Sequence, residues 1–179
     1  MLTIKSFANS YLDFHYGFGL AIAIVLFGII IFVTAKRHKS QGESISRKEV
    51  LYCLALSVYV VLILGGTLLN RTIGQCNEVK LQLFWSYFEA YEKQDKALAL
   101  QMLYNVLAFI PWGVVLARIW KGERKFFVTV ASAAIFSLFI ELLQLILQCG
   151  WFEFDDVFHN TLGAVIGYAI WRIRNKKKV

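Results

Sequence analysis

The chain has 179 residues, of which 58% are hydrophobic and only 17% are charged, and its formal net charge is +7. Soluble domains carry about 25% charged residues and roughly half apolar residues, so this composition favours an integral membrane protein. The basic residues fall in short clusters between apolar runs instead of covering one soluble face, which argues against nucleic-acid binding.

The start of the chain is polar, and no small-residue cleavage pattern follows a short apolar core, so we expect no cleaved signal peptide. A helix needs about 20 mainly apolar residues to cross a bilayer. Four runs meet this requirement, and a shorter fifth has polar and basic flanks that suit a span; they cover residues 17–35, 50–69, 99–120, 126–148 and 157–173. We therefore predict an all-α fold, a polytopic membrane helical bundle of about five transmembrane helices.

The predicted bundle forms one compact body, because the connections between its helices are too short for a further domain. Residues 1–49 would form an N-terminal transmembrane helix with a basic cytoplasmic loop, and residues 50–179 the main transmembrane domain. No repeat of the kind that builds paired-half transporters is visible, and five helices offer little material for alternating access, so a transporter is disfavoured.

Lysine and arginine are concentrated on one side of the predicted bundle. Segments 36–49 and 118–125 and the tail after residue 171 hold most of them, whereas segment 149–156 on the other side holds none. Because cytoplasmic loops carry the excess of basic residues, this distribution predicts an N-terminus outside the cell and a cytoplasmic C-terminus.

The predicted outer segment 70–97 is too long for a tight turn and has the aromatic sequence LQLFWSYF at its centre. One interpretation is an interfacial helix whose Trp85 and Tyr87 lie at the level of the lipid headgroups. The other is a lid over a lipid-facing pocket. Arg71, at the outer end of the second run, either extends to the interface or binds a phosphate or carboxylate through its planar guanidinium.

The cysteines have no metal-ligand spacing. Cys53 lies in an apolar run and is interpreted as a small buried apolar residue. Cys76 and Cys149 both fall in predicted outer segments, and whether they form a disulfide stays open.

Polar and small residues recur at helical spacing in three of the predicted spans. Steps of three and four residues place each set on one face of its helix. The sets are Ser137, Glu141, Gln144 and Gln148 in the fourth span, Asp156, Asn160, Gly163 and Gly167 in the fifth, and Gln101, Asn105 and Ala108 in the third. At about 1.5 Å rise per residue, Asn105, Glu141 and Asn160 reach a similar depth, so we expect the three faces to converge in the outer half of the membrane.

Glu141 is the strongest candidate for a functional residue. An ionised carboxylate near the middle of a bilayer costs on the order of 3 kcal/mol, so Glu141 should face the interior of the bundle. Carboxamides can donate hydrogen bonds to it there, and the candidates are Gln144, Asn105 and Asn160.

Other polar and small residues have structural explanations. Gln101 and Ser137 are interpreted as hydrogen-bonding contacts between helices, each worth about 1 kcal/mol or less. Gly163 and Gly167 form a small-xxx-small pair that would bring the fifth span against the face of Glu141.

The acidic pair Asp155 and Asp156 precedes the fifth span. One of the two is expected to cap the start of that helix, which leaves the other available to a ligand together with Glu153 and His159. Carboxylates bind divalent cations, but two adjacent acids do not specify a metal site. Binding of a divalent cation by Asp155 and Asp156 therefore stays one alternative, and no cofactor is predicted.

Three blocks of the sequence resemble the VanZ-like membrane proteins in order and separation. They are NVLAFIPWG, which starts at Asn105, FSLFIELLQ, which contains Glu141, and FEFDDVFHNTLGAVIGY, which contains Asp155 and Asp156 and is the most specific. The resemblance covers about residues 50–172, so 50–179 is identified as a VanZ-like domain.

Two features depart from the family pattern. Gln148 and Cys149 stand where many relatives carry a basic residue, and LQLFWSY replaces an Asn-Leu-x-Pro-Phe-like segment. The resemblance implies residence in the bacterial plasma membrane and a role in the cell envelope. The namesake of the family is an accessory factor in low-level resistance to teicoplanin-type glycopeptides, which describes a phenotype without naming a reaction.

Two functions therefore compete. In the first, the chain binds a lipid-linked cell-wall precursor or a lipoglycopeptide in a polar pocket in the outer leaflet; the ligand-binding candidates are Arg71, Asn105, Gln144, His159 and Asn160. In the second, the chain is an enzyme that acts on a lipid-linked phosphate or cell-wall precursor. Glu141 would then be the general acid/base, with Asp155 and Asp156 as metal ligands or electrostatic partners. Membrane lipids are the other expected partners, and the oligomeric state stays open.

Overall fold

The computed structural model describes residues 22–40, 42–69, 71, 74, 78–120 and 123–176. The chain divides into two compact units, Met1–Gly65 and Gly66–Val179, which are described separately below. The described residues are helical apart from two strands of two residues each and short connections, so the predicted all-α class is confirmed. The beginning of the first predicted span, residues 17–21, lies outside the described part of the chain.

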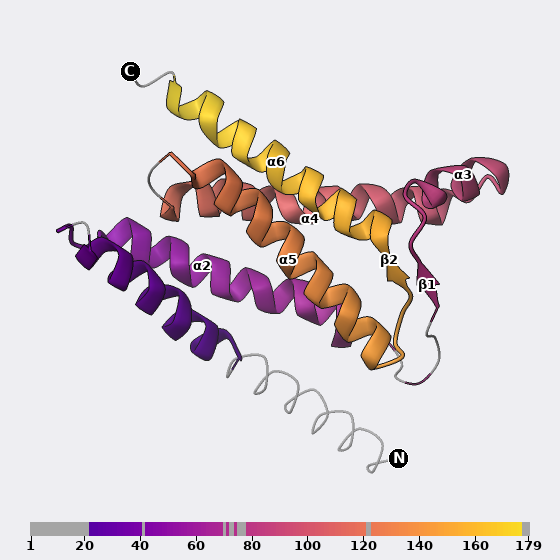
Figure 1. Cartoon of the computed structure of the whole chain (residues 1–179), viewed down its shortest axis with the longest axis horizontal. Helices are drawn as coiled ribbons and strands as arrows, with labels where there is room; N and C mark the ends of the chain where they lie inside the picture. Colours follow the sequence, from indigo (N-terminus) through magenta and orange to yellow (C-terminus); the bar gives the residue numbers. More distant parts are fainter. Residues whose placement is uncertain are drawn as a thin grey trace, which may run out of the picture. The chain divides into compact units, whose positions relative to one another are not determined.

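The first unit contains a helix over residues 22–40 and α2 (Arg47–Leu64), which follow one another closely along the chain (Figure 1). A capping box marks the start of α2. The backbone N–H of Glu49 donates to Ser46 Oγ over 3.2 Å, and the backbone N–H of Ser46 donates to Glu49 Oε2 over 2.8 Å. These bonds satisfy donors that a first helical turn leaves without partners, which explains why the helix begins where it does.

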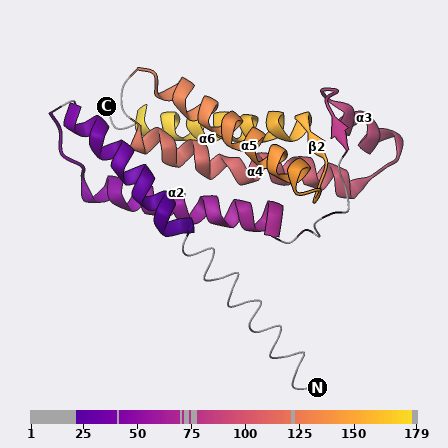
Figure 2. The ribbon, with the colours of Figure 1, turned by 60° about the horizontal axis from the view of Figure 1, so that its bottom comes forward.

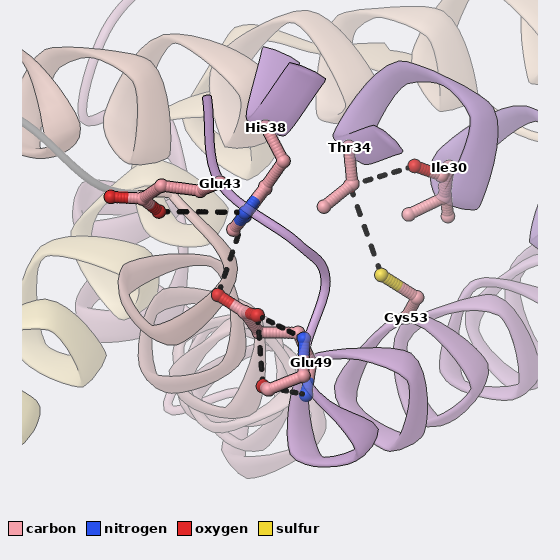
Figure 3. Close-up of polar contacts among 7 residues, drawn as sticks. Ile30, Thr34, His38, Glu43, Glu49 and Cys53 are labelled. Carbon is pink, nitrogen blue, oxygen red and sulfur yellow. Dashed lines mark hydrogen bonds and ion pairs between the residues drawn. The ribbon is translucent and has the colours of Figure 1, made fainter. Parts of the chain in front are cut away.

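Buried polar contacts connect the two helices of this unit (Figure 3). His38 is only 1% exposed, and its ring nitrogens lie 3.5 Å from Glu43 Oε2 and 3.4 Å from Glu49 Oε1. Thr34 Oγ1 lies 3.8 Å from the sulfur of Cys53, which is buried as predicted. Buried polar rings need polar partners, and the two carboxylates lie at ion-pair distance from His38, although neither ring nitrogen makes a hydrogen bond of ordinary geometry with a described residue.

A π-helical turn, η1 (Gly65–Leu69), spans the boundary between the two units. The second unit then contains, in chain order, β1 (Val79–Lys80), α3 (Trp85–Glu92), α4 (Lys96–Ile119), α5 (Lys125–Ile146), β2 (Phe152–Glu153) and α6 (Phe154–Lys176). Helices α4, α5 and α6 pack against one another. Helix α3 and both strands lie at the end of this bundle that is remote from the C-terminal end of α6 (Figure 2).

Glycine residues let α4 and α6 approach each other closely. A Cβ atom on Gly163 would overlap the carbonyl oxygen of Val106, and one on Gly167 would overlap that of Ile110; Gly113 on α4 meets the α6 backbone in the same way. The packing role predicted for the glycine pair is therefore confirmed. Their partner is α4, however, and not the α5 face with Glu141 that the sequence predicts.

Three helices of the described chain are long and apolar enough to cross a membrane, namely Arg47–Leu68, Lys96–Ile119 and Lys125–Ile146. They correspond to the second, third and fourth predicted spans. Large apolar side chains cover their outer surfaces, as Leu62 (66% exposed) and Ile135 (68% exposed) illustrate. Such continuous apolar surface suits contact with lipid, and the chain is a membrane protein.

Helix α6 covers the fifth predicted span but is less apolar than these three, because its first turns carry acidic, histidine and amide side chains. Several of these polar side chains are buried: Asp155, His159 and Asn160 are each at most 6% exposed. The number of spans, about five, and the orientation of the termini stay predictions.

Candidate functional site

The candidate site lies where α4 and α6 begin and α5 ends. Helix α5 runs in the opposite direction to α4 and α6. Residues near the start of α4 therefore lie at the same level as residues near the end of α5 (Figure 1). The three polar faces predicted from the sequence meet in this region, since α6 contacts α5 through Asn160 and α4 through Asp156.

A short parallel pairing of β1 with β2 closes this end of the second unit. Val79 pairs with Phe152 and Lys80 with Glu153, and the backbone N–H of Phe152 donates to the Glu78 carbonyl over 2.8 Å. The sequence predicts no strand here, because two residues are too few to produce a periodic pattern. The pairing holds the backbone of Glu153 in place above the end of α5.

Glu141 is 2% exposed and faces the interior of the second unit, as predicted. Its Oε2 accepts a hydrogen bond from the backbone N–H of Glu153 over 2.9 Å. The expected carboxamide donors have other partners: Gln144 Nε2 donates to the Thr67 carbonyl over 3.1 Å, and Asn160 Nδ2 donates to Ser137 Oγ over 2.7 Å. The predicted burial of Glu141 is therefore confirmed, but its donor is a backbone group, and its depth in the membrane stays a prediction.

Asp155 is fully buried and anchors α3 instead of capping its own helix. Its carboxylate accepts hydrogen bonds from the backbone N–H of Phe84, from the backbone N–H of Ser86 (3.0 Å) and from Ser86 Oγ (2.5 Å). Phe84 has a left-handed φ of 66° at the start of α3, a conformation that this carboxylate helps to hold. The N-cap role predicted for the acidic pair is thus not the role of Asp155.

Asp156 faces α4. Burial raises the pKa of its carboxyl group to about 6, and the nearby side-chain amides of Asn105 and Gln101 act in the opposite direction. Asn105 Nδ2 nevertheless makes no hydrogen bond of ordinary geometry within the described structure, and neither does Asn160 Oδ1. The third predicted face, on α4, therefore meets α6 through Asp156.

His159 contacts α3 rather than an open site. Its Nε2 lies 2.8 Å from the Tyr87 hydroxyl, and the two rings are 5.3 Å apart between centroids. His159 is 1% exposed. Together with Asp155 it attaches α3 to the first turns of α6, so α3 is positioned by buried polar contacts as well as by its aromatic residues.

The adjacent acids do not converge on one point, because Asp155 faces α3 and Asp156 faces α4. Within the described ranges, no three histidine, cysteine, aspartate or glutamate side chains gather in a geometry that would hold a metal ion. Cys149 is buried, and Cys76, its proposed disulfide partner, lies outside the described residues.

An open cleft of about 580 Å³ lies beside this polar region. Its lining comes from the segment after η1, from α3, from the start of α4 and from the segment that leads into β2. The lining residues are Arg71, Trp85, Glu89, Asp95, Ala97, Leu98, Gln101, Cys149, Gly150, Trp151 and Glu153. Of the predicted site residues only Arg71 is among them, and Glu141, Asn105, Gln144, His159 and Asn160 lie outside the lining.

Arg71 is exposed, and its guanidinium lies against Gly150, where a Cβ atom would overlap Nη1. It makes no ion pair within 4.0 Å with any residue that the structure describes. Its charge still acts at longer range on Glu141, Glu153 and Asp156. The planar donor fork of Arg71 is therefore available to an anionic group in the cleft.

Glu153, which the sequence indicated as available to a ligand beside the acidic pair, lines the cleft. Burial raises the pKa of its carboxyl group to about 7, and the nearby negative charge of Asp156 acts in the same direction, while Arg71 opposes it. Its Oε2 is shielded from solvent and has no hydrogen-bond partner in the described structure. The sequence signal for it is its place directly before the acidic pair, in a segment between two polar helix ends.

Comparison with known proteins agrees with these features. The VanZ/LLP1 family profile matches residues 18–175, which extends the resemblance into the first helix. A curated relative, Protein VanZ from Enterococcus faecium, is 34% identical over 76 residues, which cover 42% of this chain and 47% of that protein. The matched segment thus spans about half the length of that relative, and no solved structure matches the chain. Because the profile covers most of the sequence, the chain belongs to the VanZ/LLP1 family.

Proposed function

We propose that this protein binds the polar head of a lipid-linked ligand or a lipoglycopeptide in the cleft beside Arg71. The observation that carries the proposal is the cleft itself. It holds about 580 Å³, it is open to the outside, and it combines an available guanidinium with two tryptophan rings, Trp85 and Trp151. Amphiphile binding needs such a combination at a membrane surface, with polar groups for the head and aromatic groups at the interface.

The place of the cleft favours a ligand that reaches it from the membrane. It lies at the ends of α4 and α5, both of which are long and apolar enough to span, and α3 beside it exposes Phe88 (64%) and Tyr91 (79%). An amphipathic segment of this kind suits the headgroup layer. It can serve at the same time as the interfacial helix and as one wall of the cleft, so the two interpretations of segment 70–97 are compatible.

The topology that we propose is a multi-pass protein of the bacterial plasma membrane with about five spans, residues 17–35 and 157–173 being the first and the last. The basic clusters would place the C-terminus in the cytoplasm and the N-terminus outside. The cleft then opens toward the outer surface, where cell-wall precursors and glycopeptides are accessible. A contribution to glycopeptide resistance of the teicoplanin type follows from this location and from family membership as part of the proposal.

An enzyme acting on a lipid-linked phosphate is the second candidate, and the geometry favours it less. A general acid/base must reach the reacting atoms. Glu141 does not line the cleft, and its Oε2 is occupied by the backbone N–H of Glu153. The variant Glu141→Gln keeps the shape of the side chain and removes its titrating proton, so full cellular function of this variant would exclude proton transfer by Glu141.

The direct test is mass spectrometry of lipids that co-purify with the protein from native-like membranes. We expect an amphiphile with a large polar head to be retained by the wild type and depleted at least about tenfold by Arg71→Gln, since a charge-assisted hydrogen bond is worth about 1.5–3 kcal/mol. Arg174→Gln is the matched control, because Arg174 is exposed on α6 and outside the cleft. Equal retention by all three proteins would contradict the proposal.

A further inference from the structure

The cleft carries charges of both signs. Arg71 is the one cationic residue among its described lining residues, and Glu89, Asp95 and Glu153 are the acidic ones. A site for a simple anion would be expected to have an excess of positive charge. A carboxylate that is available to a ligand is expected to lack a charged or hydrogen-bonding partner within the protein.

Two of the acids already have partners within the protein. Glu89 Oε1 lies 2.5 Å from Lys93 Nζ. Asp95 caps α4, because its Oδ1 accepts hydrogen bonds from the backbone N–H groups of Ala97 (2.9 Å) and Leu98 (3.1 Å). The carboxylates of Glu89 and Asp95 are thus occupied by contacts with Lys93 and with the first turn of α4.

Glu153 differs from these two residues. Its backbone is held by the β1–β2 pairing, and the side-chain amide of Gln101, another lining residue, lies near its carboxyl group. Its Oε2 is shielded from solvent and makes no hydrogen bond of ordinary geometry with any described residue. Leaving a buried acceptor without a donor costs about 1–3 kcal/mol, and more when the group is charged. Arg71 lines the same cleft and yet forms no ion pair with it. An available cation and an available carboxyl group thus lie in one cavity without pairing.

The aromatic walls are compatible with an ammonium group near Glu153. Trp85 and Trp151 line the cleft with ring centroids 6.2 Å apart. The Nζ atom of Lys80, whose backbone pairs with Glu153, lies 5.5 Å and 5.1 Å from these two centroids. Indole faces attract ammonium groups through their quadrupole, and this pair already holds one.

We propose that the ligand of the cleft has a zwitterionic head, with an anionic group that binds Arg71 and a primary ammonium group that binds Glu153. This inference rests on the proposed function and specifies its ligand class. Each charge of the ligand would meet a lining residue of opposite charge that forms no ion pair with the described residues, and the ammonium would donate to the carboxyl group of Glu153 from within the cleft. A ligand with the same anionic group and a blocked amine would leave Glu153 unsatisfied.

The test compares two lipids in detergent solution by native mass spectrometry: phosphatidylethanolamine and its N-acetyl derivative, which keeps the phosphate and the acyl chains but has no ammonium. We expect the wild type to bind phosphatidylethanolamine about tenfold more tightly or better, which corresponds to one charge-assisted hydrogen bond. Glu153→Gln should abolish this preference. Glu153→Asp should restore it in part, and Glu92→Gln, an exposed acid of α3 outside the cleft, should keep it. Free phosphoethanolamine as competitor shows whether the head alone is recognised.

The outcomes separate this inference from the proposed function. If both lipids bind equally to the wild type and Arg71→Gln weakens both, the cleft binds a simple anion and the zwitterionic inference is overturned while the proposed function stands. A preference for the amine that survives in Glu153→Gln also overturns it, provided that thermal unfolding shows this variant to be folded. Absence of binding by both lipids overturns the inference, and if the wild type also retains no amphiphile from membranes, the proposed function fails with it.

Discussion

Asp155 and Asp156 are neighbours in the chain, yet their side chains have different partners. Successive residues on a helix point about 100° apart, so adjacent acids at the start of α6 cannot face the same element. Asp155 accepts hydrogen bonds from the start of α3, and Asp156 faces the amides of α4. The pair that resembles a metal-binding motif in the sequence thus works as two separate contacts, each of which attaches α6 to a different helix.

The carboxyl group of Glu153 should make stability depend on pH. Its pKa is raised from 4.5 to about 7 in the folded protein, so the folded state binds the proton more tightly than the unfolded state does. This contribution to stability is fully present below about pH 4.5 and is lost as pH rises toward 7. We expect the melting temperature in detergent to fall between pH 5 and pH 8, and the decrease to be smaller in Glu153→Gln.

Glu92→Gln provides the comparison for that experiment, because Glu92 is exposed on α3 and its replacement should leave the pH slope of the wild type unchanged. The measurement is thermal unfolding of the three proteins in one detergent at several pH values. Identical slopes for the wild type and Glu153→Gln would contradict the assignment of the titration to this residue.

The contact between α4 and α6 positions the site, since these helices bring Gln101 and Asn105 to Asp156. The contact depends on glycines that allow one backbone to lie directly on the other. Val106 and Ile110 carbonyl oxygens occupy the space where side chains at Gly163 and Gly167 would begin. A change at this interface therefore alters the site at a distance, through the spacing of two helices.

We expect Gly163→Ala and Gly167→Ala each to lower the free energy of unfolding by about 1–3 kcal/mol, because the added methyl group must displace a backbone carbonyl. Gly28→Ala is the matched control. Gly28 is also helical, but nothing lies within 4 Å of its added Cβ, so alanine should be neutral or stabilising by about 1 kcal/mol. Chemical unfolding in detergent measures all three, and equal effects at the three positions would contradict close α4–α6 packing.

The arrangement of the whole chain in the membrane follows from charge and apolar length. Three helices satisfy the length and composition of a span, and the clusters of lysine and arginine predict which ends face the cytoplasm. Because the proposed ligand reaches the cleft from the outer surface, the orientation of the protein is a condition of the proposed function.

Reporter fusions check this orientation. A fluorescent protein that folds only in the cytoplasm should be bright when fused after residue 179, and a periplasmic phosphatase should be active when it is inserted between residues 93 and 96, in the connection from α3 to α4. The reverse pattern would place the cleft on the cytoplasmic side and exclude an extracellular ligand. Fusion in the basic segment 36–49 is the control, which should agree with the C-terminal fusion.

Helical periodicity and apolar length were sufficient to predict the class of the protein, the helices around residues 99–120 and 126–148, and the burial of Glu141. These properties depend on interactions that recur every three or four residues and are therefore visible in the sequence. The family blocks around Asn105, Glu141 and Asp156 likewise indicated which helix ends meet, and the contacts of Asp156 with α4 agree with that expectation.

The sequence indicated Arg71 and Glu153 as groups available to a ligand, but that they line one cleft could not be predicted in this way. Arg71 and Glu153 both lie in connections that have no helical or strand periodicity. The two-residue pairing of β1 with β2 brings Glu153 to the end of α5. From the sequence alone, Asp155 could cap a helix or bind a ligand. In the structure it accepts hydrogen bonds from Phe84 and Ser86, which depends on the position of α3. Local sequence thus determined which segments are helical and which faces are polar, because both depend on near neighbours in the chain. The pairing of each polar group was decided by tertiary structure, because its partners come from segments far apart in the sequence.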